Sequence, residues 1–139
     1  MSGLSNYLKK NKIARENLVI APTQFLCGED GKPVLFTFRP LDSKENTRIR
    51  DESTKTYRKG NETKVKVDNL MYGRKLLAES CIEPDLNNEE LQDSYGVDNA
   101  EDLICEMIDV PGEFDALVSA ILEYNGFNKK DKSVEEAKN

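Results

Sequence analysis

The stretch from Val67 to Ile82 constrains the fold most, because it predicts a helix that is apolar on two sides. Tyr72 and Leu76 lie nearly opposite its main apolar stripe. That stripe contains Val67, Leu70, Met71, Leu77, Ala78, Cys81 and Ile82. A helix with two apolar sides must bury both of them, so the other elements are expected to pack around this one.

Arg74 falls in the middle of that stripe, where an unpaired charge would be costly to bury. One interpretation is an ion pair with a carboxylate from the acidic C-terminal half of the chain. The other is an arginine that contacts a partner protein. A carboxylate within salt-bridge distance of Arg74 distinguishes the two.

Three further helices are predicted over about 87–95, 99–109 and 111–125. Asn87 is the expected N-cap of the first, with Glu90 as its reciprocal partner, and Gly96 ends that helix. Pro111 suits the first turn of the last helix, and Gly126 follows its end. With the segment at about 66–82, these helices predict a small bundle.

A β-hairpin is predicted from about 18–27 and 33–39, with Asp30-Gly31 as a two-residue type I′ turn. Counting outwards from that turn pairs Cys27 with Val34, Phe25 with Phe36, and Thr23 with Phe38. The fold class expected from these patterns is α+β, mostly α, with the N-terminal hairpin packed beside the helical bundle.

The length of 139 residues predicts one domain over residues 1–126. We divide it into an N-terminal helix and hairpin (1–41), a polar helix and mobile loop (42–65), and the helical part (66–126). The mobile loop is expected because 54–66 is too polar to offset its ordering entropy. The charged tail, 127–139, is expected to be disordered.

The sequence contains no histidine, which excludes Ser-His-Asp and Cys-His catalysis and zinc sites that need an imidazole. Its three cysteines, Cys27, Cys81 and Cys105, are far apart and form no CxxC pair. They are expected to be reduced and mostly buried, as in a cytoplasmic protein. We therefore expect no enzyme activity, no cofactor and no metal site. No apolar run is long enough to cross a membrane, so no membrane partner is expected.

Charge is divided unevenly along the chain. Residues 1–66 have a net charge of +6, residues 67–139 have −12, and no Lys or Arg occurs from 76 to 128. Such a division indicates attraction within the molecule, a charged face for a partner, or, most simply, solvated helix faces. Nucleic-acid binding is not expected, because the basic residues are scattered along polar segments without interleaved aromatic residues.

Five stretches resemble the XkdN-like family of phage tail assembly chaperones, found in phages and phage-derived particles of Gram-positive bacteria. Together they span most of residues 8–127, and the sequence LQDSYGV is the most specific part. The matching stretches are 8–13 (LKKNKI), 38–41 (FRPL), 84–86 (PDL), 90–97 (ELQDSYGV) and 111–114 (PGEF).

This resemblance implies a non-enzymatic protein that binds the long, helical tape measure protein and keeps it soluble before the tail tube forms around it. It leaves the major tail tube protein and a second copy of the chain as further candidate partners. It also implies a location in the cytoplasm of the bacterial host and absence from the mature particle.

A chaperone of an apolar helical client needs an adaptable apolar groove and a solubilising charge. The acidic 85–115 face, or a groove beside it, is the expected contact surface. The alternative for each apolar candidate is an ordinary position in the core. The candidate partner-binding residues are Leu91, Tyr95, Met107, Phe114 and Arg74.

Two other functions remain open on the sequence. An acidic protein that mimics nucleic acid, and so inhibits a DNA-binding enzyme, would carry regularly spaced exposed carboxylates on one surface. A minor structural tail protein would remain in the finished particle. An apolar groove would favour the chaperone over the first, and the composition of purified particles separates it from the second.

Overall fold

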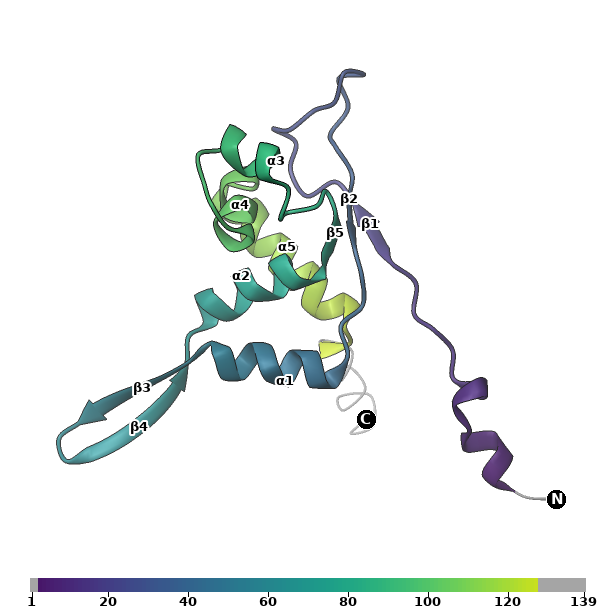
Figure 1. Ribbon diagram of the computed structural model, residues 1–139, viewed down its shortest axis with the longest axis vertical. Coiled ribbons are helices and arrows are strands. Elements are labelled where there is room, and N and C mark those ends of the chain that lie inside the picture. The colour runs from purple at the N-terminus through teal and green to yellow at the C-terminus, as the bar shows by residue number, and fades with distance from the viewer. Residues whose placement is uncertain (1–2, 128–139) are drawn as a thin grey trace, which may run out of the picture.

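The computed structural model describes residues 3–127 and confirms an α+β fold that is mostly helical (Figure 1). The helices are α1 (Ser43–Glu52), α2 (Asn69–Ser80), α3 (Glu89–Ser94), α4 (Ala100–Met107) and α5 (Pro111–Tyr124), with 3-10 turns η1 (Gly3–Tyr7) and η2 (Lys9–Asn11). The strands are β1 (Leu18–Ile20), β2 (Phe36–Phe38), β3 (Thr54–Lys59), β4 (Glu62–Val67) and β5 (Cys81–Glu83).

Strands β1, β2 and β5 form an antiparallel sheet with β2 in the middle. The predicted hairpin register is wrong: Phe38 pairs with Leu18, and Phe36 pairs with Ile20. Thr23, the predicted partner of Phe38, instead donates a hydrogen bond from Oγ1 to Glu113 Oε1 at 2.7 Å. This contact with the first turn of α5 draws the segment after β1 away from β2, so the two strands are joined by a long loop.

The predicted type I′ turn at Asp30-Gly31 is also wrong. Gly28 N donates to Lys32 O, and Gly31 N donates to Gly28 O, both at 3.0 Å. Only Gly31 of the central pair has a positive φ, 77°, whereas a type I′ turn needs positive φ at both residues. The tip is therefore a three-residue loop with glycine in the left-handed position, and an isolated bridge joins Cys27 to Pro33.

Helix α2 is shorter than the predicted 66–82 helix, because both ends of that stretch belong to strands. Val67 ends β4, and Asp68 caps the helix by accepting a hydrogen bond from Met71 N at 3.1 Å. At the other end, Cys81 begins β5 and pairs with Phe38. The third strand of the sheet, Cys81–Glu83, was missed because so short a segment with two apolar residues looks the same at the end of a helix as in a strand.

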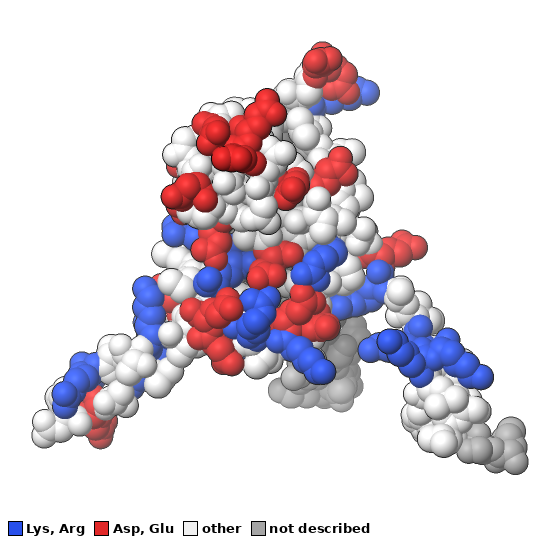
Figure 2. All heavy atoms as spheres, in the orientation of Figure 1, with Lys and Arg blue, Asp and Glu red and all other residues white. Residues whose placement is uncertain are grey.

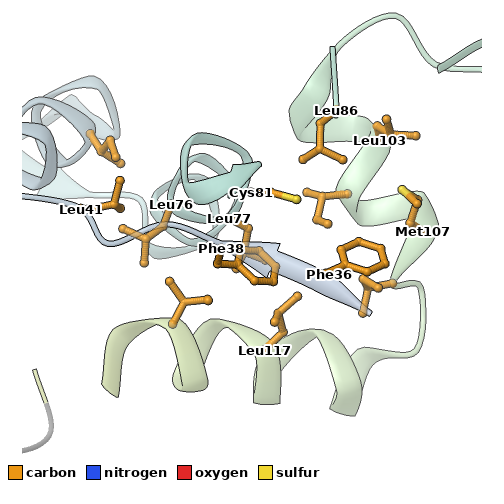
Figure 3. Packing of buried hydrophobic residues seen from close by; sticks show 14 residues of the cluster. Phe36, Phe38, Leu41, Leu76, Leu77, Cys81, Leu86, Leu103, Met107 and Leu117 are labelled. Atoms are coloured by element: carbon orange, nitrogen blue, oxygen red, sulfur yellow. The ribbon is translucent and has the colours of Figure 1, made fainter. Parts of the chain in front are cut away.

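The hydrophobic core lies where the sheet meets α2, α4 and α5 (Figure 3). Phe36 and Phe38 are two residues apart on β2, so both point to the helices, and their ring centroids lie 6.4 Å apart. Helix α2 contacts α1, α4 and α5, which confirms its central place. The buried core comprises Phe36, Phe38, Leu41, Ile49, Leu76, Leu77, Cys81, Leu86, Leu103, Ile104, Met107, Ile108, Leu117 and Ile121.

The predicted mobile loop at 54–66 is a β-hairpin that projects from the body (Figure 1). Strands β3 and β4 pair from Thr54–Val67 to Lys59–Glu62, with Gly60-Asn61 as the two-residue connection. Gly60 has φ 63° and Asn61 has no positive φ, the pattern of a type II′ turn. Alternating threonine and valine side chains favour strands although almost every side chain is exposed. Composition therefore misled the prediction, and the Gly-Asn signal should have outweighed it.

The ends of α3, α4 and α5 agree with the predicted ranges to within two residues. Asn99 caps α4, Pro111 begins α5, and Gly126 follows α5 with φ 92°. The cap of α3 is Asn88, whose Oδ1 accepts from Leu91 N at 2.9 Å, and not the predicted Asn87. Asn87 N is already bonded to Asp85 Oδ1, so the helix begins one residue later. Gly96, with φ 70°, ends it as predicted.

The N-terminal segment contains 3-10 turns where a short helix was predicted, and it extends away from the body as an exposed arm (Figure 1). Its inner end is fastened to the end of α5. Arg15 Nη2 donates to Leu41 O at 2.5 Å, and Tyr124 OH donates to Glu16 O. Of the predicted tail, 127–139, only Phe127 lies within the described residues.

Asn125 joins the end of α5 to the segment that leads into α1, and replacing it with alanine is expected to destabilise the protein by about 1–3 kcal/mol. Its Oδ1 accepts from Leu41 N at 2.9 Å, and its Nδ2 donates to Ile121 O at 2.9 Å. Alanine leaves the amide of the buried Leu41 without this acceptor. Chemical denaturation measures the loss. Asn125→Asp keeps an acceptor oxygen and should lose less; equal losses would contradict this explanation.

Candidate functional site

An acidic surface covers the helices farthest from the projecting hairpin (Figures 1 and 2). We call it the acidic face and define it by exposed carboxylates of α3, α4 and the turn between them. These are Glu89, Glu90, Asp93, Asp98, Asp102 and Glu106. Because residues 76–127 contain no Lys or Arg, no basic side chain from this part of the chain neutralises it.

Local contacts fix α3 within this face. Leu86 is buried in the core and anchors the segment, and its carbonyl accepts a hydrogen bond from Gln92 Nε2 at 2.8 Å. Leu91, on the same helix, is half-buried and packs against the core. A shallow depression of about 410 Å³ lies there, lined by Pro84, Asp85, Asn88, Glu90, Leu91 and Ser94. The acidic face therefore has an apolar floor at one point.

The predicted site residues do not line one common groove. Leu91, Tyr95 and Phe114 are half-buried and pack against the core, whereas Met107 is only 8% exposed and belongs to the core itself. Of these residues and Arg74, only Leu91 lines the depression on α3. A role for Met107 in binding would require repacking of the core, while Leu91 is available at the surface.

The predicted ion pair of Arg74 is wrong. Arg74 is exposed, and within residues 3–127 no carboxylate forms a salt bridge with it. Its neighbour Lys75 makes the connection to the acidic helices instead, with Nζ 2.9 Å from Glu101 Oε1 and 3.8 Å from Glu52 Oε2. Successive side chains point about 100° apart around a helix. The charge of Lys75 therefore lies at the junction of α2 and α4, while that of Arg74 lies at the surface. The hydrogen bond from Lys75 to Glu101 raises the pKa of the lysine.

Attraction within the molecule accounts for part of the charge division. Arg39 makes two hydrogen bonds to Glu45, at 2.6 and 3.1 Å, and these hold the pKa of that carboxyl below its usual value. Arg48 reaches from α1 to Glu79 on α2 at 2.9 Å. The first pair lies within the N-terminal half, whereas the second joins α1 to α2 and so links the basic and acidic halves. Within the described part of the chain no salt bridge reaches the acidic face on α3 and α4; Lys75, at its edge, pairs with Glu101.

Two exposed surfaces were not predicted as functional. The N-terminal arm carries exposed apolar side chains, among which Tyr7 and Ile13 are 85% and 89% exposed. The β3–β4 hairpin carries several exposed lysines together with Tyr57 and Val65. Several exposed apolar side chains on one segment are typical of contact surfaces. The signal in the sequence was the alternation of lysine with threonine, tyrosine and valine over 54–67.

Two kinds of feature, a metal-binding cluster and a membrane-spanning helix, are absent from the described residues. No group of three or more Cys, Asp or Glu side chains in residues 3–127 is placed to hold a metal ion. None of the helices described is both long and apolar enough to cross a bilayer. What the described residues do present are exposed charged and apolar surfaces.

Comparison with known proteins identifies a family and two relatives. The family model described as phage XkdN-like tail assembly chaperone protein, TAC, matches residues 4–138. The protein XkdN of the phage-like element PBSX of Bacillus subtilis (strain 168) is 23% identical over 139 residues, covering 98% of this chain and 93% of XkdN. The uncharacterized protein YqbN of the same strain is 22% identical over 136 residues, covering 96% of this chain and 91% of YqbN.

The fold also has a counterpart among solved structures. The crystal structure of YqbN superimposes with a TM-score of 0.72 at 18% sequence identity, covering 91% of this chain and 98% of that one. At this identity the likeness establishes a shared fold. The fold therefore belongs to more than one sequence.

Proposed function

The chain belongs to the phage XkdN-like tail assembly chaperone family, and from this premise we propose that it binds the tape measure protein and keeps it soluble while the tail tube assembles. The family gives the chain a role in phage tail assembly. The observation that carries the proposal is the family match over residues 4–138, which leaves almost no part of the sequence outside it. The proposal adds two partners to this role: the tape measure protein as client and the tail tube protein as a second partner.

Physical features of the surface support a chaperone of this kind. A helical client with exposed apolar stripes aggregates unless those stripes are covered and the complex carries charge. The apolar floor at Leu91 offers cover, and the surrounding carboxylates keep the complex negatively charged. The action proposed is non-enzymatic, takes place in the cytoplasm of the bacterial host, and ends before the particle is complete.

Co-expression tests the proposal directly. The tape measure protein should be mostly insoluble when expressed alone, and it should become soluble and co-purify when this chain is expressed with it. A tape measure protein that remains insoluble with equal amounts of the chain present would overturn the proposal. Mass spectrometry of purified particles separates the chaperone from a minor structural tail protein, since the chaperone should be missing.

Within that assay, Leu91→Asp and Arg74→Glu are expected to weaken binding to the tape measure protein by about tenfold each, or about 1.4 kcal/mol. Leu91 lines the depression, and Arg74 is an exposed cation that makes no salt bridge within the described residues. Isothermal titration calorimetry with a soluble tape measure fragment measures the affinity.

The control for the second variant is Lys44→Glu on α1, which makes the same charge change at another exposed position. Arg74→Glu should leave the free energy of unfolding within about 0.5 kcal/mol of the unsubstituted protein, as surface changes usually do. Leu91 and Tyr95 both pack against the core, so the free energy of unfolding of Leu91→Asp and of Tyr95→Ala is measured beside their affinity for the fragment. Unchanged affinity for both Leu91→Asp and Arg74→Glu would exclude these two residues from the client site.

A further inference from the structure

The β3–β4 hairpin projects from the junction of α1 and α2 and is held to the body at its base (Figure 1). Asp68 N donates a hydrogen bond to Ser53 O at 2.7 Å, and beyond that point the strands bond to each other. Both strands are edges, and almost all of their side chains are exposed. The core gains nothing from such a projection, and exposed strands of this kind are able to contact another chain.

The register gives the hairpin two different faces. Lys55 lies opposite Lys66, Tyr57 opposite Lys64, and Lys59 opposite Glu62, and directly paired residues share a face. We call this the lysine face; it consists of Lys55, Tyr57, Lys59, Glu62, Lys64 and Lys66. The other face carries mainly threonine and valine. Charge is thus sorted to one side of the hairpin.

Most lysines of the lysine face form no salt bridge within the described residues. Lys55 forms a salt bridge to Asp68 at 2.9 Å, and in residues 3–127 the other three lysines form none. Like charges that lie opposite each other across two strands destabilise the pair. An approaching set of carboxylates would remove that repulsion, so the face is suited to an acidic partner.

Apolar surface adjoins the lysines at the base of the hairpin. A depression of about 480 Å³ is lined there by Lys55, Thr56, Tyr57, Lys66, Val67, Asp68, Asn69 and Leu70. Leu70, on the first turn of α2, is 70% exposed, and Tyr57 is 44% exposed. The surface therefore fits a partner that presents carboxylates around an apolar side chain.

The acidic face has that composition: Leu91 and Glu90 line its depression, and Asp93 is another exposed carboxylate of α3. It lies at the far end of the molecule from the hairpin, which projects in another direction (Figures 1 and 2). The two surfaces of one molecule therefore cannot meet, but those of two molecules can. We propose that the lysine face and the depression at its base bind the acidic face of a second copy of this chain.

Such a contact joins two different surfaces, so each bound copy still has one surface of each kind free. Association then continues into rings or open chains. The contact depends on exposed charges and so weakens as salt screens them. It involves no tape measure protein and can be tested with the purified chain alone, so its failure and the failure of the proposed function are separate results.

Sedimentation velocity on the full chain tests the proposal. The mean mass should exceed that of the monomer and rise with protein concentration in about 0.1 M salt, where charges are screened over about 10 Å, and should fall towards the monomer in about 1 M salt, where the distance is about 3 Å. A protein that stays monomeric at low salt up to its solubility limit overturns the proposal.

Charge reversal identifies the surfaces. The double variant Lys64→Glu, Lys66→Glu and the double variant Glu90→Lys, Asp93→Lys should each weaken self-association by about tenfold or more, as loss of complementary charge does. Mixing the two variants should restore a complex, because the unaltered lysine face of the second fits the unaltered acidic face of the first. Association that persists in either variant alone, or no complex in the mixture, overturns the proposal.

Lys32→Glu with Lys44→Glu is the matched control, since it makes the same charge change at exposed lysines away from the hairpin. It should associate like the unsubstituted chain, and circular dichroism should show all variants folded. A labelled single-stranded RNA tests the alternative that the lysine face binds a nucleic acid. If RNA binds the unsubstituted chain and not the Lys64→Glu, Lys66→Glu variant, while self-association is absent, the lysine face is a nucleic-acid site and the proposal is wrong.

Discussion

Replacing Phe38 with alanine is expected to lower the free energy of unfolding by about 3–5 kcal/mol. Phe38 lies on the central strand, is fully buried, and packs beside Phe36 against the helices. The substitution removes most of an aromatic side chain and leaves a cavity that neighbours on three elements cannot all close. A domain of this size has only about 5–15 kcal/mol of stability, so the loss is a large fraction of it.

Urea denaturation, followed by circular dichroism, measures this loss. Leu35→Ala is the control, because Leu35 precedes the same strand and is exposed. Its effect should stay within about 0.5 kcal/mol. If the two variants unfolded at the same urea concentration, Phe38 would not be the centre of the core described here.

Native Cys81 is expected to react with a thiol reagent about a thousandfold more slowly than the same cysteine in the unfolded chain. Burial raises the pKa of this thiol to about 12, from an ordinary value of 9.0. Only the thiolate reacts, and three pH units reduce its share about a thousandfold at a given pH below 9. The Sγ atom also lies 3.5 Å from Pro84 O, within the turn that leads to α3.

The experiment uses the double variant Cys27→Ser, Cys105→Ala, so that Cys81 is the one thiol left. Labelling with Ellman's reagent is compared with and without denaturant at pH 8. Equal rates would mean that Cys81 is accessible in the native protein and that β5 does not hold it in the core.

The same pKa predicts how stability depends on pH. Because the native pKa is raised, the unfolded chain loses its proton first as the pH rises above about 9. The contribution of Cys81 is fully present below that pH and is lost between about 9 and 12, by about 1.4 kcal/mol per pH unit at most. Cys81→Ala should show a flatter decline over this range.

Several errors of prediction have one physical cause. The pairing of Phe38 with Leu18 depends on Glu113, which lies far along the chain and holds Thr23 by a hydrogen bond. A turn signal at Asp30-Gly31 could not reveal that contact. The salt bridge predicted for Arg74 belongs to Lys75 for a similar reason, since the rotation of α2 is set by the neighbours it packs against.

What the sequence determined by itself is local. The start of α4 follows from Asn99, and the two ends of α5 follow from Pro111 and Gly126, because these signals need only residues within one turn of the helix. The two-sided helix at α2, the α+β class and the family also came from the order of residues alone. Each depends on a pattern within a short stretch, or on likeness between whole sequences.

Only the tertiary structure decided which surfaces are exposed and where they point. Leu91 and Met107 are both apolar helix residues in the acidic half, yet one lines a surface depression and the other is core. Likewise, the lysine face exists because β4 returns beside β3 and sorts alternate side chains to one side. Burial and charge patterns arise from contacts between distant segments, and the sequence of one segment does not determine which other segment it contacts.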